Sequence, residues 1–103
     1  MTPIIPNKVI ICGIPHKVEL VADYFDTDIH FGQIDYAKAE IRINKNATPE
    51  LQMQSLFHEI LHGILVLTGE AELAGDERFV QNLSNAMYGT FSIRDEGAGT
   101  DEE

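Results

Sequence analysis

The sequence predicts an α+β domain in which a small N-terminal β-sheet, antiparallel or mixed, packs on one long helix and a second, C-terminal helix. Three observations support this fold class. Short runs in the first half alternate apolar and polar residues, as strands do. Residues 50–68 form a proline-free apolar stretch, and residues 76–93 carry apolar side chains at helical spacing. A chain of 103 residues is long enough for one domain with a single modest core.

Two strands are predicted near the N-terminus, at residues 9–12 and 16–21, on either side of the turn-prone residues 13–15. Their short separation indicates a hairpin. Cys12 would lie inside the first strand as a small buried residue, and His16 is expected at the surface. A single cysteine provides no disulfide framework, which is typical of a reducing cytoplasm.

A second hairpin is predicted from residues 32–36 and 40–44, with a short turn between them. In the later strand, Ile41 and Ile43 share one face, whereas Glu40, Arg42 and Asn44 share the other. This strand could pair with an extended substrate by edge addition, or it could be a purely structural edge strand.

The long helix is expected to begin after Thr48 and to end before Gly69. Thr48 is a good N-cap, and Pro49 fits the first helical position, whose N–H has no partner within a helix. Gly69 is a natural C-terminal stop. The stretch between them is apolar on nearly every side, which is typical of a buried helix. Gly63 inside it indicates close packing, either against the sheet or against the second helix.

A second helix is expected from about Asp76 to about Ile93, after a connection of uncertain structure at residues 69–75. Its apolar stripe comprises Phe79, Val80, Leu83, Ala86, Met87 and Phe91. Residues 94–103 are acidic and rich in glycine, so we expect a disordered tail there. The single domain is then residues 1–93.

The charge distribution excludes some classes of partner. The formal net charge is −10, and the lysines and arginines are scattered singly, which argues against direct nucleic-acid binding. The longest uninterrupted apolar run, residues 64–67, is far too short to span a bilayer, and the N-terminus has no signal-peptide pattern. We therefore expect a cytoplasmic protein that does not bind membranes.

The motif H-E-x-x-H lies in the predicted long helix, at His58, Glu59 and His62. Residues four apart share one helix face, so the two imidazoles can bind one metal ion. Glu59 is rotated by about 100° from His58, beside the metal, where a general base for an activated water must stand. A chance match would fall more often on a polar surface helix, whereas this helix is apolar.

A third ligand is needed, because catalytic zinc sites usually have three protein ligands and one open position. The extended pattern H-E-x-x-H-x-x-G-x-x-H fails, since Leu65 and Thr68 stand at its last two defined positions. The favoured candidates for the third ligand are therefore carboxylate side chains. Glu77, at the start of the second helix, is favoured by spacing, and Asp76 and Glu72 are the alternatives.

Three segments together resemble the small zincins of the ImmA/IrrE type, above all their short phage and prophage versions. These are the strand 40–44, the segment 56–63 and the segment 76–83, and the likeness covers about residues 33–91. In that family the third ligand is a Glu followed by small or apolar residues, and Val80, Leu83 and Ser84 stand at the matching positions after Glu77. The resemblance implies a minimal zincin-like domain with Zn²⁺ held by His58, His62 and Glu77.

The resemblance also implies a function: a zinc metallopeptidase encoded by a bacterium or a phage and present in the host cytoplasm. Glu59 would be the general base, and the substrate a protein or peptide, such as a repressor or a host protein. The alternative is a zinc-stabilised protein-binding module without catalysis. The intact Glu59 favours the enzyme, because a purely structural site needs no base beside the metal.

Peptide hydrolysis also needs a hydrogen-bond donor for the oxyanion. Tyr36, His30 and Arg42 are the candidates in the sequence. Tyr88 shares a helix face with Glu77, but eleven residues of helical rise place it about 16 Å away. We therefore do not expect Tyr88 to be this donor.

Overall fold

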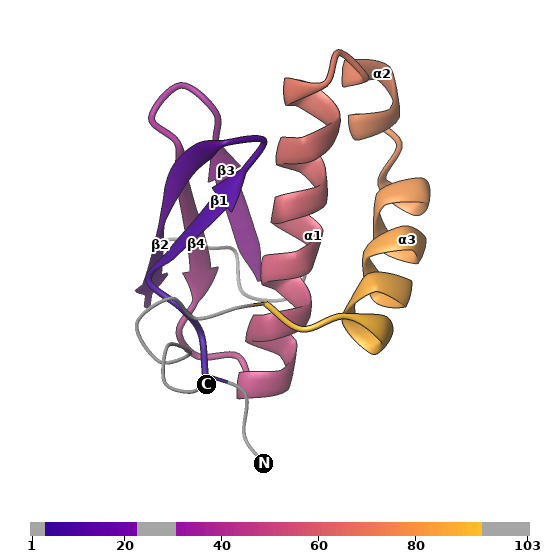
Figure 1. Ribbon diagram of the computed structural model, residues 1–103. Coiled ribbons are helices and arrows are strands. Elements are labelled where there is room, and N and C mark those ends of the chain that lie inside the picture. Colours follow the sequence, from indigo (N-terminus) through magenta and orange to yellow (C-terminus); the bar gives the residue numbers. More distant parts are fainter. Residues whose placement is uncertain (1–3, 23–30, 94–103) are drawn as a thin grey trace, which may run out of the picture.

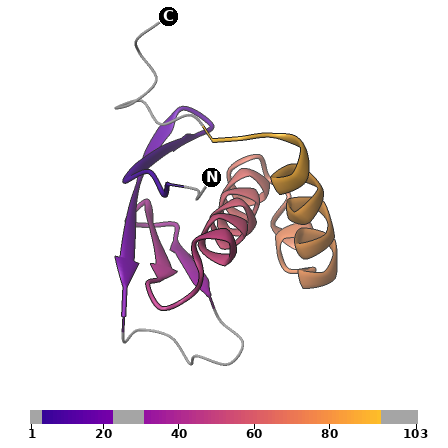
Figure 2. The same ribbon diagram turned by 90° about the horizontal axis from the view of Figure 1, so that it is seen from below.

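The computed structural model describes residues 4–22 and 31–93. Four strands form one mixed sheet in the order β1-β2-β4-β3. Helix α1 covers one face of this sheet, and α3 lies on the far side of α1, so the elements form three layers (Figures 1 and 2). The α+β class is confirmed. The elements are β1 (Lys8–Ile11), β2 (Ile14–Val21), β3 (Gly32–Asp35), β4 (Glu40–Asn44), α1 (Pro49–Leu67), α2 (Ala71–Ala74) and α3 (Glu77–Thr90).

The first hairpin turns at Cys12 and Gly13, one residue earlier than predicted. Both residues have positive φ angles, 51° and 82°, which is the requirement of a two-residue type I′ turn. Cys12 is therefore exposed at the turn and does not lie inside a strand. The expectation for His16 was also wrong: it is only 2% exposed, and its Nδ1 lies 2.8 Å from the Ile14 carbonyl oxygen.

The second hairpin pairs β3 with β4, and Ile34 lies opposite Ile41. Its turn is held by the Lys38 N–H, which donates to Asp35 Oδ1 at 3.1 Å. β4 is not an edge strand, because it also pairs in parallel with β2. The edges of the sheet are β1 and β3. Edge addition of a substrate at β4 is therefore excluded.

The main core lies between the inner face of the sheet and α1. Ile41, Ile43 and Leu56 are fully buried there. A Cβ added at Gly63 would come within 3.1 Å of Ile11 Cδ1 and 3.2 Å of Ile34 Cδ1. The close packing predicted at this glycine is therefore directed at the sheet.

The boundaries of α1 are those expected from its caps. Thr48 Oγ1 accepts a hydrogen bond from the Leu51 N–H at 3.2 Å, and Pro49 is the first helical residue. After the helix, Gly69 has a φ of 87°. The buried side chain of Gln52 donates to the carbonyls of Lys45 and Ala47, which fixes the loop before the helix.

Helix α3 starts as predicted but ends at Thr90, before Ile93. Its predicted apolar stripe is only partly the buried face. Val80 is fully buried, whereas Phe79 and Leu83 are 36% and 40% exposed. The fully buried Ser84 lies on the true contact face, where a small side chain lets the helices approach closely.

Two expectations fall outside the described residues: the disordered tail at 94–103 and the position of His30. Within residues 4–22 and 31–93, no helix combines the length and the apolar character that a membrane crossing requires.

Candidate metal centre

The two histidines of the motif lie one turn apart on α1 and face α3. His58 Nε2 and His62 Nε2 are 3.2 Å apart, and their side chains are largely buried. Two imidazole nitrogens this close cannot both donate a proton to each other, so a group between them or beside them must satisfy at least one.

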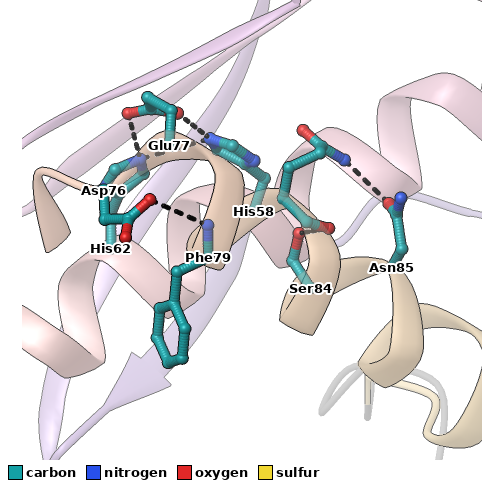
Figure 3. A network of polar contacts seen from close by, with 8 residues as sticks. His58, His62, Asp76, Glu77, Phe79, Ser84 and Asn85 are labelled. Carbon is teal, nitrogen blue, oxygen red and sulfur yellow. Dashed lines mark hydrogen bonds and ion pairs between the residues drawn. The ribbon is translucent and has the colours of Figure 1, made fainter. Parts of the chain in front are cut away.

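Glu77 joins these histidines in a group of three candidate ligand residues, called the triangle below. The short helix α2 reverses the chain after α1, so that the first residue of α3 lies beside the motif. Glu77 Oε1 is 3.1 Å from His58 Nε2, and Oε2 is 3.1 Å from His62 Nε2 (Figure 3). The structure thus brings three residues from two helices to one point.

The spacing of these residues suits a single metal ion. Each histidine Nε2 lies 3.1 Å from a different oxygen of Glu77, and the two Nε2 atoms are 3.2 Å apart. With one ligand atom taken from each residue, the three atoms lie within 4.8 Å of one another. Two imidazoles and one carboxylate are also a donor set that zinc commonly takes. The residues therefore fit the metal that the sequence implied.

The other two candidate ligands lie away from this point. Asp76 is the N-cap of α3, and its Oδ1 accepts from the Phe79 N–H at 3.1 Å (Figure 3). Glu72 is an exposed residue of α2. Neither belongs to the group that could hold an ion among the described residues.

Burial changes the ionisation of the residues around the triangle. Burial, followed by the negative charge of Glu77, raises the pKa of Glu59 to about 8. Burial also lowers the pKa of His62, although the Glu77 carboxylate and a hydrogen bond to the Ala74 carbonyl oppose this shift. A bound dication would oppose the shift of Glu59, because it stabilises the carboxylate.

The side chain of Glu59 extends from α1 toward the edge strand β3. It is only 7% exposed. A Cβ added at Gly32 would come within 3.2 Å of Glu59 Cγ and 3.4 Å of its Oε2. Gly32 therefore leaves the space that the Glu59 carboxyl group occupies.

An open cleft of about 670 Å³ lies over the triangle. One wall is β3 with the residues on either side of it, and the other is formed by α1 and α3. Lysine and arginine are absent from the described residues that line it. These residues are Phe31, Gly32, Gln33, Ile34, Tyr36, Leu51, Gln54, Ser55, His58, Glu59, His62, Glu77 and Gln81.

Of the candidate oxyanion donors among the described residues, one lines the cleft and the others do not. Tyr36 lines the cleft. Arg42 alternates with the buried Ile41 and Ile43, so it lies on the outer face of the sheet, where it binds Glu40 at 3.0 Å. Tyr88 packs edge-to-face on Phe57 with ring centroids 6.0 Å apart, and it does not line the cleft.

A cluster of carboxamide side chains near the triangle was missed from the sequence. Asn85 Oδ1 accepts from both Gln54 Nε2 and Gln81 Nε2 at 2.7 Å, which links α1 to α3. Gln54 precedes His58 by four residues, and Gln81 follows Glu77 by four. This spacing places each amide on the same helix face as a candidate ligand, and from it the cluster could have been predicted.

No protein-family model, curated protein or solved structure matches the chain. The likeness to ImmA/IrrE-type zincins therefore remains an interpretation of the motif, its flanking strand and the position of Glu77.

Proposed function

We propose that the protein is a zinc-dependent peptidase that hydrolyses a peptide bond with an activated water. The observation that carries this proposal is the convergence of Glu77 on both histidine Nε2 atoms, with the buried Glu59 next to them. A site with only a structural role would need neither the cleft above it nor a base beside it.

His58, His62 and Glu77 would hold the ion, and all three residues line the cleft. A bound zinc ion supplies Lewis acidity, which lowers the pKa of a water molecule and polarises a carbonyl group. The protein residues supply orientation. The contacts of Glu77 with both Nε2 atoms hold the two rings facing one point.

Glu59 is assigned the proton transfers. It would take a proton from the attacking water and deliver it to the amine nitrogen as the carbon–nitrogen bond breaks. A carboxyl group whose pKa is raised toward neutrality suits both steps, because it accepts and releases a proton near the working pH. Gly32 supports this role by leaving room for the carboxyl group.

The edge strand β3 offers a place for an extended substrate. The Asn44 N–H donates to the Phe31 carbonyl at 2.7 Å, and hydrogen-bonded pairs alternate along an antiparallel ladder. The backbone groups of Gly32 and Ile34 therefore point toward the open edge beside the cleft. A protein segment in extended conformation can pair with them and bring a peptide bond over the triangle. We propose a bacterial or phage-host protein, such as a repressor, as the substrate.

A zinc-stabilised binding module is the second candidate function. The outer face of α3 favours it, because Phe79 and Leu83 are 36% and 40% exposed. Exposed apolar side chains on one helix face are typical of protein-binding surfaces. Catalysis and simple binding differ in what Glu59 contributes, so a variant at this residue separates them.

The test uses Glu59→Gln as bait in a bacterial lysate, with wild type and Glu72→Gln as controls. Glutamine keeps the shape and the zinc but removes the base, which is worth about 10²–10⁴ in rate. A peptidase should retain an intact partner on Glu59→Gln and release fragments from the two controls, as read by mass spectrometry. Equal capture of the same intact partner by all three proteins would support the binding module and refute catalysis.

A further inference from the structure

Addition of water to a peptide carbonyl moves the π electron pair onto the carbonyl oxygen. The resulting alkoxide needs a hydrogen-bond donor that is already in place. The cleft has no lysine or arginine among the described residues that line it, and His58 and His62 point their Nε2 atoms at the triangle. Among the described residues, the donor must therefore come from a neutral side chain or from the backbone.

The glutamine side chains of the cleft are held by other contacts or begin on another face. Gln54 and Gln81 each donate one of two amide hydrogens to Asn85 Oδ1, which ties both side chains to the contact between α1 and α3. Gln33 alternates with Gly32 and Ile34, so its side chain begins on the opposite face of β3. Ser55 remains on α1, three residues before His58, with a short side chain.

Tyr36 differs from these residues in its reach and its placement. It directly follows β3, the strand proposed to hold the substrate, and its side chain lines the cleft. The turn that carries it is closed by the Ala39 N–H, which donates to the Tyr36 carbonyl at 3.4 Å. Burial, with smaller contributions from Glu59 and Glu77, raises the pKa of Tyr36, so its hydroxyl keeps its proton at neutral pH.

We infer that Tyr36 is a catalytic residue whose phenol O–H donates a hydrogen bond to the alkoxide oxygen formed when water adds to the substrate carbonyl. This inference rests on the proposed peptidase function. The phenol proton stays on Tyr36 throughout. The water proton goes to Glu59 and then to the leaving amine, and the alkoxide electron pair re-forms the carbonyl as the carbon–nitrogen bond breaks.

The first experiment measures anion binding and does not depend on a substrate. Methylphosphonate, a small tetrahedral oxyanion, is titrated calorimetrically into the zinc-loaded protein. Tyr36→Phe should bind it about 10-fold or more weakly than wild type, because a hydrogen bond to a charged oxygen is lost. Tyr88→Phe, outside the cleft, and Ser55→Ala should bind it as wild type does, and zinc affinity should be equal in all four proteins.

The second experiment uses the substrate retained by Glu59→Gln. Tyr36→Phe should lower kcat by about 10²–10³-fold with little change in KM, as expected for a donor that acts on the transition state. A merely structural tyrosine would change the melting temperature, and would leave phosphonate affinity and kcat unaltered.

The outcomes separate the two proposals. Wild-type affinity for methylphosphonate in Tyr36→Phe would overturn the role of Tyr36 and leave the peptidase intact. A loss in Ser55→Ala with none in Tyr36→Phe would do the same and assign the donor to Ser55. If the zinc-loaded wild type binds no methylphosphonate, the kcat of Tyr36→Phe decides: an unaltered kcat overturns the role of Tyr36, and the absence of any cleaved substrate overturns both proposals.

Discussion

Replacement of Glu77 by glutamine tests the candidate metal centre most directly. The change keeps the shape of the side chain and removes the charge from two oxygens that each lie 3.1 Å from a histidine Nε2. A neutral amide is a poor ligand for a dication. We expect zinc affinity to fall by about 10-fold or more, which corresponds to at least ~1.4 kcal/mol.

Part of this loss would come from charge alone, and the chain offers controls for it. The Glu77 side chain is 67% exposed, so solvent and salt screen the attraction of its charge for a zinc ion that it does not contact. Glu72→Gln removes the same charge from an exposed position outside the triangle and measures that contribution. Asp76→Asn removes a charge one residue away but keeps the N-cap, since Asn caps a helix about as well as Asp.

The assay is a competition titration of each metal-free variant against a chromophoric zinc chelator, with the melting temperature recorded to verify folding. Glu77→Gln should differ from the other two variants by most of the tenfold loss. Zinc affinity in Glu77→Gln equal to that of Glu72→Gln would refute ligation by Glu77. A greater loss in Asp76→Asn would move the ligand by one residue.

Three further predictions concern metal, pH and packing. The purified protein should contain one zinc per chain by elemental analysis, chelation should lower its melting temperature, and His58→Ala or His62→Ala should abolish both effects. In the metal-free protein, the raised pKa of Glu59 means that the folded state binds more protons than the unfolded state between about pH 4.5 and 8. The contribution of protonated Glu59 to the free energy of unfolding is therefore fully present below pH 4.5, and it is lost as pH rises through 8. Urea unfolding should therefore show Glu59→Gln gaining stability over wild type at pH 9 relative to pH 5, by up to a few kcal/mol, and a constant difference would contradict the shift. Gly89→Ala, where an added Cβ meets nothing within 4 Å, should stabilise by up to ~1 kcal/mol, whereas Gly63→Ala should gain less or destabilise in the same urea titration.

The sequence predicted the features of this fold that are encoded locally. Thr48 and Asp76 cap the two long helices as expected, because a capping side chain bonds to backbone only two or three residues away. The two hairpins also form, since each needs only two short strands and a tight turn. These signals lie within a few residues of each other, so they can be interpreted without knowledge of the tertiary structure.

The order of the strands could not be predicted in this way. β4 alternates buried and less buried residues, and this pattern is the same for an edge strand and for an interior strand with one solvated face. Only its parallel pairing with β2 distinguishes them, and that pairing joins Val18 to Ile41, two residues that lie in different hairpins. The open edge that we propose for substrate pairing is therefore that of β3, the strand that borders Glu59 and the cleft.

The buried face of α3 was misjudged for a related reason. The apolar pattern included Val80, which is fully buried, but it also included Phe79 and Leu83, which are largely exposed. It left out the fully buried Ser84, because close approach to α1 depends on shape as well as on apolar character. Glu77 lies on the same face of α3 as Val80 and Ser84, whereas the apolar pattern alone places it beside the apolar stripe. A polar candidate ligand on a helix contact face is a departure from the apolar pattern, and such departures are expected at functional sites.

The choice of Glu77 over its neighbours follows from the way α3 begins. Spacing alone left Glu72 and Asp76 open as ligands. The Asp76 Oδ1 accepts from the Phe79 N–H, so the capping residue is occupied and the first helical residue is Glu77. One residue on a helix corresponds to about 100° of rotation, so a cap shifted by one position would turn the carboxylate away from both imidazoles. The ligand triangle therefore depends on a capping residue that does not belong to it.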